Sequence, residues 1–150
     1  GAGDSSIIAS GNHTMTTTSE AGAAGGVAIS PSIALAVSTL NRIAVITAGP
    51  GGFNTAGSVT VEAQLTDAPI ASTTTAKGSA TSGGTAAAGI ALALTIATDT
   101  VSATIEREVT AGGAVSVLAF GQSSRSSDAM ASAVGAPAAA RFAGRLRWVR

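Results

Sequence analysis

Cysteine and tyrosine are absent from this chain of 150 residues, and aromatic residues make up only 3% of it. The lack of cysteine excludes disulfide bonds, thiol catalysis and cysteine-ligated zinc. A single histidine, His13, leaves little material for general acid–base catalysis or for a histidine metal site. So few aromatic side chains also leave little to line a ligand pocket. These absences predict a protein that is not an enzyme and that binds neither a cofactor nor a metal ion.

Charged residues are scarce too, at 11% of the chain against roughly 25% in a typical soluble domain. Half of the basic residues lie within the last ten positions: Arg141, Arg145, Arg147 and Arg150. Residues 1–140 therefore carry four basic residues against eight acids, a net charge of −4. A mildly acidic body argues against a nucleic-acid partner. We expect membrane contact, if there is any, only through these four arginines and Trp148.

A repeated pattern is the main feature that the chain does contain. Ile33-Ala-Leu-Ala-Val-Ser returns as Ile90-Ala-Leu-Ala-Leu-Thr, 57 residues later. Thr55-Ala-Gly-Ser-Val-Thr-Val-Glu-Ala63 returns as Thr110-Ala-Gly-Gly-Ala-Val-Ser-Val-Leu-Ala119, with Val59 and Val115 56 residues apart. Such a period is typical of repeat proteins, in which one supersecondary unit is stacked on the next.

Within the repeated segments the residues alternate with a period of two. Ile33, Leu35 and Val37 are separated by Ala34 and Ala36, and the same pattern runs from Ile90 to Ile96. Large aliphatic residues on one face and small or polar residues on the other predict half-buried β-strands. We therefore expect three pairs of residues to occupy equivalent buried positions: Ile33 and Ile90, Val59 and Val115, and Val61 and Val117.

Strands repeated at a constant period predict an all-β fold, a parallel β-solenoid built from repeated rungs. Residues 1–135 form the predicted solenoid, with two copies of a repeat of about 56 residues after a partial N-terminal copy. Residues 136–150 depart from the pattern and are predicted to be an arginine-rich tail, either a cap or a non-native terminus. An antiparallel β-sandwich stays open as an alternative, because alternation does not determine the direction of strand pairing.

Two loops differ between the copies while the strands around them repeat. The first contains Gly49, Pro50, Gly51, Gly52, Phe53 and Asn54, and the second contains Glu106, Arg107 and Glu108. Pro50 and the glycines are typical of a tight turn. Since repeat proteins carry their variation in loops, often on the binding face, these nine residues are the candidate contact loops.

The segment Ile105-Glu-Arg-Glu-Val-Thr-Ala-Gly-Gly-Ala-Val-Ser-Val-Leu-Ala119 follows an Ile-Ala-Leu-Ala-Leu strand and precedes serine-rich sequence. Together these residues resemble the repeats of large bacterial exported adhesins of the filamentous-haemagglutinin-like and giant repeat types. The resemblance covers residues 6–135. It implies an extracellular or cell-surface scaffold, and it carries over no catalytic residue.

The predicted function is accordingly a structural or adhesive segment of a secreted or cell-surface bacterial protein that associates with itself. One alternative is a β-sandwich binding module, or a structural module of a fibre or capsid. A second alternative is a threonine-rich solenoid of the ice-binding type, because Thr16–Thr18 recur as Thr73–Thr75 at an offset of 57.

Overall fold

A computed structural model describes residues 1–66, 72–135 and 138–149. Over these residues the chain is all β and contains no helix, so none of them forms a helix that could cross a membrane. The strands are β1 (Ser5–Gly11), β2 (Met15–Ile46), β3 (Phe53–Thr55), β4 (Val59–Thr66), β5 (Ser72–Ile105), β6 (Val109–Ala111), β7 (Val115–Gln122), β8 (Arg125–Val134) and β9 (Ala138–Val149). The pairs β1–β4, β4–β7, β3–β6, β5–β8 and β5–β9 are all parallel. The predicted all-β class is confirmed, and its sheets are parallel.

The strands belong to two compact units, each made of three separate stretches of the chain. The first, which we call the valine unit, comprises Gly1–His13, Thr39–Pro69 and Asp99–Ser123. The second, the alanine unit, comprises Thr14–Ser38, Ile70–Thr98 and Ser124–Arg150. The long strands β2 and β5 each contribute one part to the valine unit and one part to the alanine unit.

The register of the valine unit follows the sequence repeat. Its three-stranded sheet has the order β1-β4-β7, and β4 pairs with β7 so that Val59 lies beside Val115 and Val61 beside Val117. The equivalence of each pair, predicted from the sequence, is confirmed, but the prediction that both members are buried is wrong for Val115 and Val117. Their burial is not equal, because Val59 and Val61 are at most 1% exposed whereas Val115 and Val117 are about half exposed.

The core of the valine unit is aliphatic. Val59 and Val61 of β4 pack with Ile46 of β2, and Val101 and Ile105 of β5 complete the cluster. A fully buried valine contributes about 1.5 kcal/mol or more of hydrophobic free energy. No residue of β7 belongs to this cluster, so Val115 and Val117 stay half exposed.

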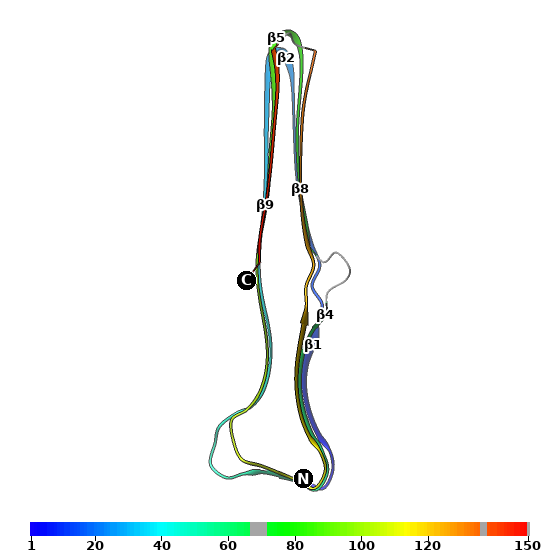
Figure 1. Ribbon diagram of the computed structural model, residues 1–150, viewed down its shortest axis with the longest axis vertical. Coiled ribbons are helices and arrows are strands. Elements are labelled where there is room, and N and C mark those ends of the chain that lie inside the picture. Colours follow the sequence, from blue (N-terminus) through cyan, green and yellow to red (C-terminus); the bar gives the residue numbers. More distant parts are fainter. Residues whose placement is uncertain (67–71, 136–137, 150) are drawn as a thin grey trace. The chain divides into compact units, whose positions relative to one another are not determined.

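The alanine unit contains two layers, because β2 and β5 both reverse direction within it (Figure 1). In β2 the reversal follows Gly25, whose φ of 152° favours glycine. In β5 the segment before the reversal, Ser72–Thr81, pairs with β8, and the segment after it, Ala86–Ala97, pairs with β9. The layers face each other, since Ser32 Oγ donates to Ser19 O at 2.8 Å and Thr95 Oγ1 donates to Thr74 Oγ1 at 2.8 Å.

Small residues fill the space between these layers. The buried hydrophobic residues in the described part of this unit are all alanines, among them Ala34, Ala76, Ala91 and Ala93. The surroundings of Gly78 explain why these buried side chains are small, because a Cβ at this position would overlap the carbonyl oxygen of Ile90 in the opposite layer. The two backbones therefore approach too closely for leucine or isoleucine to fit between them.

The aliphatic residues of the alanine unit point outward instead. Ile33 is 65% exposed and Leu35 is 53% exposed, while Ala34 and Ala36 between them are buried. Ile90, at 37%, is likewise on the outer side. The alternation was therefore predicted correctly, but the prediction that Ile33 and Ile90 are buried is wrong, because the glycine-mediated approach of the layers leaves room only for small side chains.

The C-terminal tail joins the alanine unit as a strand. β9 lies beside β5, with Ile90 opposite Phe142 and Thr95 opposite Arg147. Residues 138–149 thus extend a sheet that the sequence repeat begins. The role of the tail as a cap stays a prediction.

Candidate functional site

The two candidate contact loops lie next to each other in the valine unit. Phe53 and Asn54, predicted to lie in the first loop, form most of strand β3, and β6 follows the second loop. The two strands pair in parallel with Phe53 beside Val109. Phe53 N donates to Glu108 O at 2.8 Å, and Glu106 N donates to Ile46 O at 2.8 Å. The loops that the sequence singled out separately are therefore one continuous surface.

Side chains of the second loop hold the first loop in place. Arg107 Nε donates to Thr47 O at 2.6 Å, and its guanidinium lies against Gly49, where a Cβ would collide with it. The carboxylate of Glu106 accepts a 3.4 Å hydrogen bond from Ala48 N. The side chains of Arg107 and Glu106 thus contact the neighbouring loop. The side chain of Glu108 makes none of these contacts.

Most of this surface is open to solvent. Gly49, Pro50, Gly51, Gly52 and Asn54 are exposed, as are Glu106 and Glu108, whereas Phe53 and Arg107 are half buried. Exposed glycine backbone beside two carboxylates offers hydrogen-bond donors and acceptors to a partner. Across the described residues no three His, Asp or Glu side chains converge to hold a metal ion. The arrangement supports contact with another surface.

The N-terminal residues join this site, and the sequence analysis missed them. The Gly1 amino group donates to Asn54 O at 2.9 Å, and Thr55 Oγ1 donates to Gly3 O. Ser58 N donates to the Asp4 carboxylate at 2.7 Å. The segment 1–4 is too short to show a period in the sequence. Asp4, as a possible acceptor for backbone N–H groups, was the sequence feature that could have indicated its role.

Two arginines of the tail contact β8. Arg145 forms an ion pair with Asp128 at 2.9 Å, and Arg147 Nη1 donates to Arg125 O at 2.6 Å. Arg141 is exposed. Arg150 and the side chain of Trp148 lie outside the described residues. Two of the four arginines that were candidates for membrane contact therefore have partners within the alanine unit.

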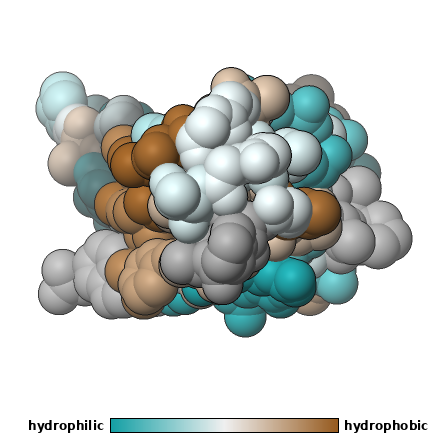
Figure 2. Space-filling model, turned by 90° about the horizontal axis from the view of Figure 1, so that it is seen from above, coloured by the Kyte–Doolittle hydropathy of each residue, from teal (hydrophilic) through white to brown (hydrophobic). Residues whose placement is uncertain are grey.

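A second surface, which we call the apolar face, covers the outer side of the alanine unit after the reversals. It consists of the odd-numbered residues 27–37 of β2, the even-numbered residues 86–96 of β5 and the even-numbered residues 140–146 of β9. Every one of these sixteen residues is apolar. Figure 2, which looks onto the turn end of the unit, shows hydrophobic residues gathered left of centre and hydrophilic ones mainly to the right.

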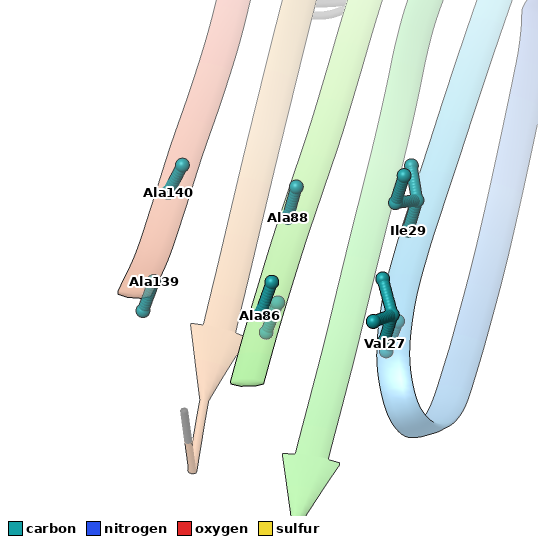
Figure 3. Close-up of a pocket in the computed structure, with 8 residues that line it drawn as sticks. Val27, Ile29, Ala86, Ala88, Ala139 and Ala140 are labelled. Atoms are coloured by element: carbon teal, nitrogen blue, oxygen red, sulfur yellow. The ribbon is translucent and has the colours of Figure 1, made fainter. Parts of the chain in front are cut away.

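The apolar face contains a hollow near the turns. Val27 and Ile29 of β2 stand beside Ala86 and Ala88 of β5 and Ala140 of β9, which leaves an apolar space of about 330 Å³ (Figure 3). Because large and small side chains lie on neighbouring strands, the surface of this face is uneven. Sequence reasoning missed the face because alanines separate Ile33, Leu35 and Val37 and also Ile90, Leu92 and Leu94, so hydropathy alone does not say which set lies inside there.

The opposite outer side of the same unit, the threonine face, is mostly polar. It consists of Thr16, Thr18 and Glu20 of β2, Thr73, Thr75, Lys77, Ser79 and Thr81 of β5, and Ser126, Asp128, Met130, Ser132 and Val134 of β8. Met130 and Val134 are the large apolar side chains among these residues, and the other residues carry hydroxyl groups or charges. Lys77 Nζ lies 2.8 Å from Glu20 Oε1. The hydrogen bond and the charge of Glu20 raise the pKa of Lys77 above its ordinary value of 10.5.

Comparison with known proteins finds no matching family, no matching curated protein and no matching solved structure.

Proposed function

We propose that this chain is a non-catalytic structural and adhesive segment of a secreted or cell-surface bacterial protein, built as a parallel β-solenoid that associates with itself. One observation carries the proposal. Strands far apart in the sequence pair in parallel at nearly constant offsets, namely 54 residues for Ser5 and Val59, 56 for Val59 and Val115, and 53 for Ser72 and Arg125. A chain that advances by one strand spacing with each repeat produces this pattern.

The parallel pairing also favours a solenoid over the β-sandwich alternative. A sandwich of the usual kind joins neighbouring antiparallel strands by hairpins. The register of β5 with both β8 and β9 is parallel in each of its two segments. Two parallel layers that succeed each other along the same chain are the expected cross-section of a flattened solenoid.

The joined contact loops are the proposed adhesive surface. Most of their residues are exposed, they differ between the two copies of the repeat, and Arg107 holds them together. Contacts of this kind are weak singly and gain strength through multiple copies. Adhesion by an extended scaffold therefore needs no deep pocket.

The test is attachment of bacteria that display the chain and otherwise lack adhesins. We expect attachment to cultured epithelial cells or to glass, reduced at least about tenfold when Gly49–Asn54 and Glu106–Glu108 are both replaced by glycine and serine. The matched control replaces Thr16, Thr18 and Thr81 of the threonine face by serine. Display without attachment to either surface would overturn the adhesive function, and unchanged attachment after both loop replacements would move the contact away from the loops.

One observation favours ice binding as a second candidate. Thr16 and Thr18 on β2 and Thr73 and Thr75 on β5 lie on the same outer side of the alanine unit. The rank is interrupted on β8, where Asp128 lies beside Thr75. Thermal hysteresis of a protein solution tests this candidate directly: a gap between melting and freezing points would support it, and coincident points would contradict it.

A further inference from the structure

The apolar face is large and uniform. It spans three parallel strands, and none of its sixteen residues carries a polar side chain. The threonine face of the same unit carries Met130 and Val134, but most of its residues have hydroxyl groups or charges of either sign. Monomeric proteins rarely leave a contiguous apolar patch of more than a few hundred Å² in water. The contrast between the two faces therefore indicates that the apolar face is covered.

Its size matches what a specific interface needs. The face spans residues 27–37, 86–96 and 140–146, and strands about 4.8 Å apart with about 3.3 Å per residue give it a footprint on the order of 460 Å². Two such faces pressed together remove about 1,000 Å² or more from water, because side chains standing out from the sheet add to the flat footprint. That total reaches the size expected of a specific protein–protein interface.

The apolar character of the face limits what kind of surface can cover it. It offers no charge and no side-chain hydrogen bond, so the surface that covers it must be apolar as well. Flat β-sheets pack face to face about 10 Å apart. The protruding Ile33 and Phe142, which are 65% and 69% exposed, lie on the same face as the hollow beside Ala86, Ala88 and Ala140. A face that carries both protrusions and a hollow can be complementary to a second copy of itself.

The interior of the alanine unit gives a further reason for such a cover. Its buried hydrophobic residues are alanines, so the large aliphatic side chains lie on the outside, with Leu35 at 53% and Leu146 at 59% exposed. Hydrophobic stabilisation scales with apolar area removed from water. Most of the hydrophobic stabilisation available to this unit is therefore obtained only when its outer face is buried.

We propose that two copies of this chain pair through their apolar faces, with a two-fold axis between the alanine units. The pairing deepens the proposed function, because it rests on the self-association of the scaffold and assigns a surface to it. Such an isologous contact closes at two copies, and the apolar face contains no residue of the contact loops.

Sedimentation of the full chain, with the folded state monitored by circular dichroism, tests this pairing. We expect a dimer for the wild type and an increase of at least about tenfold in dissociation constant for Leu35→Asp and for Phe142→Asp, since each buries an unpaired carboxylate in the interface. The matched control is Thr81→Asp, an equal charge on the threonine face of β5, which should leave dimerisation unchanged. A wild type that remains monomeric, or equal effects of all three variants, would overturn the proposal.

A cross-link provides a readout that does not depend on a destabilising charge. Because the chain has no cysteine, Leu92→Cys introduces a single thiol on the apolar face and Thr75→Cys a single thiol on the threonine face. A bismaleimide that spans about 10 Å should join two copies of Leu92→Cys and not of Thr75→Cys. Cross-linking of Thr75→Cys alone would place the contact on the other face and overturn the proposal.

Uncharged phosphatidylcholine vesicles test a lipid as the alternative cover. A dimer that does not float with the vesicles supports pairing of two copies, and a monomer that floats with them contradicts it. The attachment assay remains separate: loss of attachment with an intact dimer rejects only the adhesive function, whereas attachment by a monomeric wild type rejects only the pairing.

Discussion

In the valine unit, β4 turns Val59, Val61 and Leu65 toward the interior, whereas in the alanine unit β2 turns Ile33 and Leu35 away from it. Both strands alternate with a period of two, but β4 alternates apolar with polar residues and this part of β2 alternates large aliphatic residues with alanine. The difference is set by what lies opposite. Ile46 and Val101 face β4 across an ordinary aliphatic core, while the layers of the alanine unit meet where Gly78 and Gly89 permit close backbone contact.

This comparison teaches that alternation identifies two faces of a strand and does not by itself identify the buried one. Where one face is polar, water decides the orientation. Around Ala34 and around Ala91 both faces of the strand are apolar, so the separation between the layers decides it. Gly89 illustrates this, because a Cβ there would overlap the carbonyl oxygen of Ser132.

The largest effect is expected from a methyl group placed between the layers. Gly78→Ala forces a Cβ into the carbonyl oxygens of Ile90 and Ser30, and the free energy of unfolding should fall by about 3 kcal/mol or more. Urea denaturation measures the loss. The matched control is Gly83→Ala, where no atom lies within 4 Å of the added Cβ, and its effect should stay within about 0.5 kcal/mol. Equal stability of the two variants would contradict the close approach of the layers.

The next effect compares equivalent truncations in the two units. Val61→Ala removes two methyl groups from a fully buried position and should cost about 2 kcal/mol. Leu35→Ala removes a larger group from a position that is 53% exposed and should cost less than about 1 kcal/mol when the chain is diluted to a monomer. A greater loss for Leu35→Ala under those conditions would mean that the aliphatic side chains of the alanine unit lie inside.

A smaller effect is expected at the hydroxyl groups between the layers. Thr95 Oγ1 lies 2.8 Å from Thr74 Oγ1 and 2.7 Å from Ser127 Oγ. Thr95→Val keeps the shape but removes a hydrogen-bond partner from two other hydroxyls, which should cost about 1–2 kcal/mol in thermal or urea unfolding. Thr100→Val, at an exposed position of β5, is the control and should be neutral. A neutral Thr95→Val would show that these hydroxyls reach water.

The smallest effect concerns the ion pair of Lys77 with Glu20. The pKa of Lys77 in the folded protein is raised above 10.5. The contribution of the pair to stability is therefore complete below that pH and is lost as the pH rises through the pKa of folded Lys77. Both side chains are about half exposed, which screens the pair and keeps its contribution small. Comparing the melting temperatures of wild type and Lys77→Met should show a slight difference at neutral pH that disappears in strong alkali. A difference that grows with pH would have the wrong sign.

Much of the architecture follows from the sequence. The repeat predicts that Val59 lies beside Val115 and Val61 beside Val117, and the register confirms both. The period of two predicts strands, and the constant offset between copies is consistent with the parallel direction that the sheets have. These features depend on local alternation and on the equivalence of copies, which a single sequence contains.

The orientation of the alanine unit and part of the candidate site could not be predicted in the same way. Leu92 is 39% exposed although it alternates with Ala91 and Ala93, because the distance between the layers is a tertiary property that the sequence does not contain. The two loops were identified by their variation, yet the hydrogen bond of Arg107 to Thr47 O and the attachment of Gly1 to Asn54 required the three-dimensional arrangement.

The central claim is that small residues fill the alanine unit and aliphatic residues cover it. Its most direct test is the free energy of unfolding of Ala91→Leu, measured beside Ala88→Leu on the same strand. Ala91 is fully buried in the alanine cluster, so the larger side chain should cost about 3 kcal/mol or prevent folding, whereas Ala88 lines the hollow on the outer face and should accept leucine with little loss. A stable Ala91→Leu together with an unfolded Ala88→Leu would contradict the account.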